Sequence, residues 1–192
     1  MSQQDDILRF WFTRSPGEKG SGNMRKVWFL KNSAFDQDIH TRFRLVYEQA
    51  MTGAFDGWQE TAEGCLALVL LFDQFPRNMF RGTPQAFATD DRALAIAQKA
   101  LDRRFDQSLP VVQRWFLYMP FEHSENLEHQ RRAVELFYPL RNNPDARGTY
   151  SYAIKHLAII EQFGRFPHRN QILGRESTAA EREFLKQPGS SF

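Results

Sequence analysis

The chain has 192 residues, of which 42% are hydrophobic, so it can bury one sizeable core, and we expect a single domain over residues 1–192. Its 25 basic and 23 acidic residues are mixed along the chain. The sequence therefore lacks the basic stripe that is typical of a dedicated nucleic-acid-binding protein. The longest apolar run is far shorter than the ~20 residues of a membrane-spanning helix, and the polar first residues do not form a signal peptide. We therefore expect a soluble, cytoplasmic protein without nucleic-acid or membrane partners.

The N-terminal third contains one expected loop and one expected helix. Residues 13–23 are rich in Gly, Ser and Pro and predict a mobile loop. Ser33 and Asp36 have the spacing of a capping box at the start of a helix, and Gly53 supplies a stop. Between them, apolar residues recur on one helical face: Phe35, Ile39, Phe43, Val46 and Ala50.

Residues 61–75 are apolar almost all round, which predicts a central buried helix that Pro76 ends. The core of this run, taken alone, also fits a buried strand. Cys65 lies in this run and is expected to be a core residue rather than a nucleophile. Asp73 continues an apolar stripe in the last helical turn, where the helix dipole disfavours negative charge. We therefore expect its carboxylate to be partly buried and paired with Arg77.

Helices follow in the second half of the chain. Thr89, followed by Asp90 and Asp91, indicates a helix N-terminus. The segment 110–118 is expected to form the next helix, which Pro120 prevents from continuing.

Ser124 is expected to cap a helix that runs to Phe137. A further helix over 150–163 ends at Gly164, and a capping box at 178–181 opens a last short helix.

No segment shows sustained alternation or a hairpin turn typical of strands, so the fold class is expected to be all-α. The many Phe and Trp residues are expected to build the core rather than an exposed binding platform. The tail 187–192 is expected to be loose.

One sequence motif occurs twice. Asp73-Gln74-Phe75-Pro76-Arg77 recurs as Glu161-Gln162-Phe163-Gly164-Arg165, and each copy opens a loop rich in Arg and Asn. The simplest interpretation is an ion pair in each copy that ties the helix end to its loop. The alternative is that each acid orients an arginine towards a ligand.

The two loops supply the candidate ligand-binding residues. Guanidinium and amide groups before a helix N-terminus suit a phosphate or a carboxylate. The candidates are Arg77, Asn78, Arg81, Arg165, His168, Arg169, Asn170 and Arg175.

A further polar cluster surrounds His123 and Glu125. Glu125 and His129 have the spacing of two metal ligands, but zinc needs three or four, so we expect no metal. Ser124 lacks the surroundings of a nucleophile. His156 lies on an apolar stripe and is expected in the core. Without a phosphate-cradling loop or a dinucleotide fingerprint, no cofactor is expected.

Taken together, the motifs at 6–12, 73–83, 86–90, 120–125 and 163–178 resemble the bacterial family known as domain of unknown function 924. The resemblance implies a tetratricopeptide-like right-handed superhelix of antiparallel helix pairs, with no established activity. The sequence shows no ~34-residue period, so any repeats are degenerate.

Three hypotheses for function follow. The first, which we prefer, is a binding module whose Arg/Asn/His-rich cleft holds a small anion or an acidic peptide. The second is a hydrolase or transferase acting on a phosphorylated or carboxylated substrate. It uses His123 or His168 as general acid/base, oriented by Glu125 or Asp73. In the third, the polar clusters are purely structural and an exposed aromatic patch forms a homo-oligomer.

Overall fold

The computed structural model describes residues 2–13 and 25–191. Within these ranges the regular elements are all helical, which confirms the all-α prediction. The loop expected over residues 13–23 lies outside the described residues, apart from Thr13. The α-helices are α1 (Gln3–Phe12), α2 (Ser33–Met51), α3 (Ala62–Val69), α4 (Phe75–Met79), α5 (Asp90–Asp102), α6 (Val111–His123), α7 (Leu127–Phe137), α8 (Thr149–Phe163) and α9 (Ala179–Phe184).

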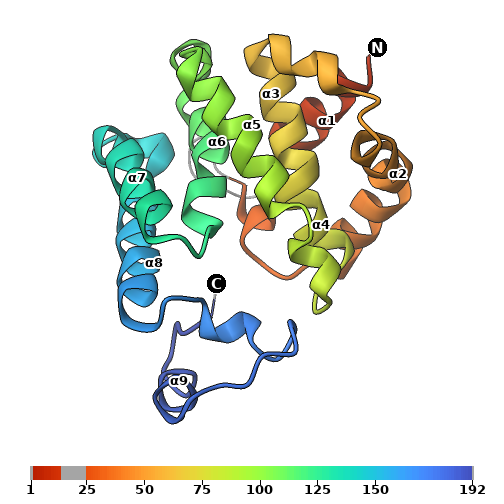
Figure 1. Cartoon of the computed structure of the whole chain (residues 1–192). Helices are drawn as coiled ribbons and strands as arrows, with labels where there is room; N and C mark the ends of the chain where they lie inside the picture. The colour runs from red at the N-terminus through yellow and green to blue at the C-terminus, as the bar shows by residue number, and fades with distance from the viewer. Residues whose placement is uncertain (1, 14–24, 192) are drawn as a thin grey trace.

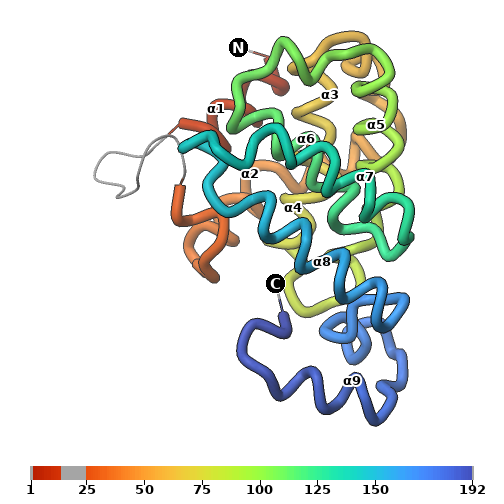
Figure 2. The backbone as a smooth tube through the Cα atoms, turned by 90° about the vertical axis from the view of Figure 1, so that its left-hand side faces the viewer, coloured from red at the N-terminus to blue at the C-terminus, as the bar shows by residue number. Residues whose placement is uncertain are grey.

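The helices pack around α3. In Figure 1, α1 and α2 lie on one side of α3, and α5 and α6 lie on the other. Further along the chain α6 packs on α7 and α7 on α8. Residues 164–191, here called the C-terminal segment, lie beyond the lower ends of α4 and α8 (Figure 2). No helix in the described ranges combines the length and apolarity needed to cross a bilayer.

Aromatic rings fill much of the core, as predicted. Trp11 is fully buried and its ring centroid lies 5.5 Å from that of Phe75 and 5.6 Å from that of Phe116. Cys65 is also fully buried, and burial raises the pKa of its thiol to about 11, so it is a core residue.

The central helix contains an irregular turn that the sequence did not predict. Between α3 and α4, Leu70–Gln74 form a π-helical turn in which the Phe75 N–H donates to the Leu70 carbonyl. The prediction that Pro76 ends the helix is wrong. Pro76 lies in the first turn of α4, where a missing N–H costs least, so the chain remains helical to Met79.

The missing N–H of Pro76 has a structural consequence at the start of α5. It leaves the Phe72 carbonyl without its α-helical donor, and Thr89 Oγ1 donates to that carbonyl at 2.6 Å. Thr89 stands at the N-terminus of α5, as expected, but its side chain does not cap the helix. Its hydroxyl instead ties α5 to the π-helical turn.

The expected end of α6 is also wrong. Pro120 lies inside α6, which continues to His123. The fully buried Gln130 donates from Nε2 to the carbonyls of Glu122 and Ser124, each at 2.6 Å, and so satisfies acceptors at this helix end.

Two predicted helix caps are displaced. Asn126, not Ser124, caps α7, because its Oδ1 accepts from Glu128 N at 2.8 Å. Asn32, not Ser33, caps α2, since its Oδ1 accepts from Phe35 N at 3.0 Å. In both places an asparagine close to the predicted residue provides the acceptor.

Two predictions near the C-terminus are confirmed. Gly164 ends α8 with a left-handed φ of 68°, and Thr178 forms a capping box with Glu181 at α9. Within the expected loose tail 187–192, Ser190 is buried and its Oγ donates to the Leu185 carbonyl at 3.2 Å. The mobility of that tail stays a prediction.

The Thr89 hydrogen bond can be tested by substitution. We expect Thr89→Val to lower the free energy of unfolding by about 1–3 kcal/mol, because it leaves the buried Phe72 carbonyl without a donor. Thr89→Ser, which keeps the hydroxyl, should lose less. Urea denaturation measures both, with the exposed Thr83→Val as a control. Equal stability of Thr89→Val and wild type would contradict the assignment.

Candidate functional site

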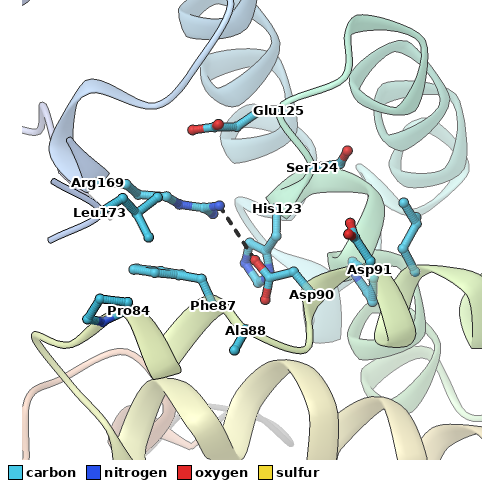
Figure 3. A pocket seen from close by; sticks show the side chains of 12 residues that line it. Pro84, Phe87, Ala88, Asp90, Asp91, His123, Ser124, Glu125, Arg169 and Leu173 are labelled. Carbon is cyan, nitrogen blue, oxygen red and sulfur yellow. Dashed lines mark ion pairs between the residues drawn. The ribbon is translucent and has the colours of Figure 1, made fainter. Parts of the chain in front are cut away.

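A cavity of about 290 Å³ lies between the α4–α5 connection, the end of α6 and the C-terminal segment. Figure 3 shows it from close by, with His123 and Asp90 facing Arg169. The residues that line it are Pro84, Phe87, Ala88, Asp90, Asp91, Leu94, Pro120, His123, Ser124, Glu125, Arg169 and Leu173.

Behind this cavity lies a buried aspartate. The Asp73 side chain is fully buried in the π-helical turn, and its Oδ1 lies 2.6 Å from His123 Nδ1 and 3.2 Å from Arg77 Nη1. Gln74 donates to Oδ2. Burial raises the pKa of Asp73, but Arg77 and His123 outweigh that effect and hold it well below its usual range. Asp73 is therefore a carboxylate, and the predicted Asp73–Arg77 pair is confirmed.

His123 connects the Asp73 carboxylate to the cavity, because it contacts Asp73 and also lines the cavity. Its side chain is 12% exposed, and because Asp73 is ionised, Nδ1 is the protonated nitrogen that donates to it. Nε2 is then the basic nitrogen of the ring. Burial lowers the pKa of His123 and outweighs the opposing effect of Asp73, so the imidazole is neutral at pH 7.

Asp90 joins two arginines. Arg77 donates from Nη1 and Nη2 to the two Asp90 oxygens at 2.7 and 2.9 Å. Arg169 approaches from the C-terminal segment, and its Nη1 lies 3.5 Å from Asp90 Oδ2. Asp90 thus accepts short hydrogen bonds from Arg77 and forms only a longer contact with Arg169.

Arg169 is buried, with only 7% of its surface exposed. Its Cζ lies 4.7 Å from the ring centroid of Phe87 and 4.6 Å from that of Phe166. Among the described residues its Nε has no hydrogen-bond partner, and Asp90 is the only carboxylate that pairs with it. The long contact with a single carboxylate leaves the buried charge of Arg169 weakly compensated.

The two arginines differ in how well their charge is compensated. Burial lowers the pKa of Arg77, but Asp73 and Asp90 outweigh burial and raise it. Burial and the nearby charge of Arg77 lower the pKa of Arg169 to about 10, so it is still protonated at pH 7. The cavity therefore contains one arginine whose positive charge is incompletely neutralised.

Glu125 attaches the C-terminal segment to the rest of the protein. Its oxygens accept from Arg175 Nη1 at 2.7 Å and Nη2 at 2.9 Å, and Oε1 also accepts from Phe166 N at 2.8 Å. Burial raises the pKa of Glu125, but these hydrogen bonds outweigh burial and lower it. Glu125 lines the cavity, but its carboxylate oxygens already accept hydrogen bonds from Arg175 and Phe166 and so hold the C-terminal segment in place.

Several predicted ligand-binding residues lie elsewhere. Asn78 Nδ2 and Arg81 Nη2 both donate to Asp36 Oδ1 on α2, at 2.7 and 2.9 Å. Arg165 forms a bidentate pair with Glu181, at 2.6 and 2.8 Å. None of these residues lines the cavity.

The remaining candidates lie within the C-terminal segment. Asn170 Nδ2 donates to Ser177 Oγ at 3.0 Å, and Arg175 is held by Glu125. His168 does not line the cavity; burial and Arg169 lower its pKa to about 3. Of the predicted site residues, His123, Glu125 and Arg169 line the cavity, and Arg77 is connected to it through Asp90.

The predicted second ion pair is wrong. Glu161 is exposed, and Arg165 pairs with Glu181 rather than with Glu161. Gly164 ends α8 with a left-handed turn, so Arg165 leaves the helical face of Glu161. In the first copy Pro76 occupies the same place and the helix continues, which keeps the acid and its arginine together.

Sequence reasoning missed the role of Asp90 and a second buried acid. Asp90 was interpreted only as a helix N-terminal acid. Glu122 is 5% exposed and its Oε1 lies 3.0 Å from Nδ1 of His156, which is buried as expected.

Within the described ranges no group of His, Cys, Asp and Glu is arranged to hold a metal ion.

The histidines of this region predict a pH dependence. Burial lowers the pKa of His168 to about 3, so between about pH 6.5 and 3 the unfolded chain binds a proton that the folded His168 does not. The pKa of His123 is also lowered by burial, which acts in the same direction. The free energy of unfolding should fall on acidification, by at most about 1.4 kcal/mol per pH unit for each group.

Urea denaturation at about pH 7.5 and about pH 5 measures this dependence. His168→Gln should make it shallower, whereas His40→Gln on α2, outside the cavity, should not change it. A dependence that is equally steep in His168→Gln and wild type would contradict the assignment to His168.

The comparisons with known proteins agree with the resemblance seen in the sequence. The profile of the family described as "Bacterial protein of unknown function (DUF924)" matches residues 7–189. A solved structure of a protein of unknown function from Agrobacterium tumefaciens has 43% sequence identity and a TM-score of 0.85 to this chain. That match covers 96% of this chain and 97% of the other. No curated protein matches. The chain belongs to the DUF924 family of bacterial proteins of unknown function.

Proposed function

We propose that this protein binds a small anionic molecule in the cavity, with Arg169 as the principal contact. The single observation that carries the proposal is the buried guanidinium of Arg169, whose only ion pair within the described structure is the 3.5 Å contact of its Nη1 with Asp90. A charged group buried with so little compensation gains from an added anion. The lowered pKa of Arg169 supports the same conclusion.

The cavity favours a small molecule over the acidic peptide that the sequence also allowed. A volume of about 290 Å³ lies at the lower end of the roughly 300–1,000 Å³ typical of ligand pockets. Several of the arginines predicted as ligand-binding residues are instead paired with acids of the chain itself, such as Arg81 with Asp36 and Arg165 with Glu181.

Calorimetric titration with acetate, benzoate and inorganic phosphate tests the proposal. We expect at least one of these anions to bind the wild type, and Arg169→Gln to weaken its binding by about tenfold or more, because a charge-assisted contact is lost. Arg44→Gln, which removes an arginine from an exposed pair on α2, is the matched control. Binding that is unaffected by Arg169→Gln would refute the proposal.

A second candidate function is catalysis, and the Asp73–His123 pair favours it. A carboxylate that fixes the tautomer of a neutral histidine, with Nε2 as the base, is the arrangement of a general acid/base. In hydrolysis, Nε2 takes a proton from water as the water oxygen attacks an ester carbon or phosphorus. The proton then passes to the departing oxygen. In a transferase an acceptor hydroxyl takes the place of water.

The catalytic candidate predicts a loss of turnover in His123→Asn. With a panel of small carboxylic and phosphate esters, we expect the rate to fall about 10²-fold or more, the range typical of a lost general base. His40→Asn, on α2, serves as the control for a histidine outside the cavity. An unchanged rate in His123→Asn, or no turnover of any ester, would argue against catalysis and leave binding as the function.

We also propose that α5 to α8 form antiparallel pairs of a tetratricopeptide-like right-handed superhelix with degenerate repeats. The packing of α5 on α6, of α6 on α7 and of α7 on α8 supports this arrangement. In this proposal the C-terminal segment meets one end of the helical array (Figure 1), and residues of both line the cavity.

A further inference from the structure

Building on the proposed anion binding at Arg169, we propose that the ligand is a monocarboxylate with an apolar tail, and not a phosphate, a nucleotide or a dicarboxylate. Three features of the cavity carry this inference: the surroundings of the Arg169 guanidinium, the carboxylates that share the cavity with it, and the apolar part of the cavity wall.

The rings beside Arg169 leave its edges as the place for a ligand. The centroids of Phe87 and Phe166 lie 4.7 and 4.6 Å from Arg169 Cζ, at distances typical of cation–π contacts. We infer from these distances that the rings stack on the faces of the planar guanidinium, so that its N–H groups point outward in the plane. A planar carboxylate fits that edge with two parallel hydrogen bonds.

The other charges in the cavity limit the ligand to one negative charge. Asp90, Asp91 and Glu125 all line the cavity. Asp90 is paired with Arg77 and Glu125 with Arg175, but Asp91 is exposed and forms no ion pair within the described part of the chain. A second negative charge on the ligand, in a space this small, would meet these carboxylates without a further arginine to accept it.

Apolar side chains complete the wall. Phe87, Leu94 and Leu173 line the cavity together with Pro84 and Pro120. In Figure 3, Phe87, Pro84 and Leu173 lie on the side from which Arg169 enters. An alkyl or aryl tail on the bound carboxylate therefore has apolar surface to cover, and each buried CH₂ adds to affinity. A cavity of about 290 Å³ suits a tail of a few carbons.

Hexanoate and adipate form a matched pair for the test, because they have the same chain length and differ in the second carboxylate. By calorimetric titration we expect hexanoate to bind at least tenfold more tightly than adipate, acetate or inorganic phosphate. Leu173→Asn should weaken hexanoate binding and leave acetate binding unchanged. Asp91→Asn should strengthen adipate binding and leave hexanoate binding unchanged.

The outcomes separate this inference from the proposal on which it rests. If adipate or phosphate binds as tightly as hexanoate, and Arg169→Gln abolishes that binding, the cavity is an anion site but the ligand class is wrong. If none of these anions binds the wild type, the anion site itself is refuted, and the inference with it.

Discussion

The site depends on one buried carboxylate. Asp73 has no exposed surface, and an ionised carboxylate in such a place must be compensated by positive charge and hydrogen bonds. Arg77, His123 and Gln74 provide that compensation. Each of these residues is thereby held in one orientation. The ion pairs that stabilise the buried charge of Asp73 therefore also fix the position of His123, which lines the cavity. The π-helical turn, a feature frequent at functional sites, brings the carboxylate to this place.

The network around Asp73 extends to Asp90. The two arginines that contact Asp90, Arg77 and Arg169, have different roles. Arg77 lies between two carboxylates and is a structural cation. Among the described carboxylates Arg169 pairs only with Asp90, whose Oδ2 lies 3.5 Å from Arg169 Nη1. The same acid therefore pairs closely with Arg77 and leaves the charge of Arg169 incompletely neutralised, which supports the proposed binding of an anion beside His123.

The cavity is completed by a segment distant in sequence. Arg169 and Leu173 belong to the C-terminal segment, which Glu125 holds through Arg175 and the Phe166 N–H. The positioning of Arg169 thus depends on a structural ion pair that touches the same cavity. A ligand bound between His123 and Arg169 would add to the contacts between the helical array and this segment.

Hydrophobic periodicity and turn residues in the sequence determined the helical class, the aromatic core, the end of α8 at Gly164 and the capping box at Thr178. These features depend on neighbours within a few residues. The sequence also indicated the Asp73–Arg77 pair, because the two lie one helical turn apart. It misplaced the effects of Pro76 and Pro120. The Thr89 hydroxyl compensates the carbonyl that Pro76 frees, and Gln130 donates to carbonyls at the end of α6, beyond Pro120.

The partners of Asp90, Arg165 and Arg169 were decided by the tertiary structure alone. An arginine side chain can reach any acid that folding brings within a few ångströms, and local sequence does not specify which one is nearest. The repeated motif shows this difference. Its first copy continues as a helix and keeps its ion pair, whereas its second copy turns at Gly164 and exchanges Glu161 for Glu181.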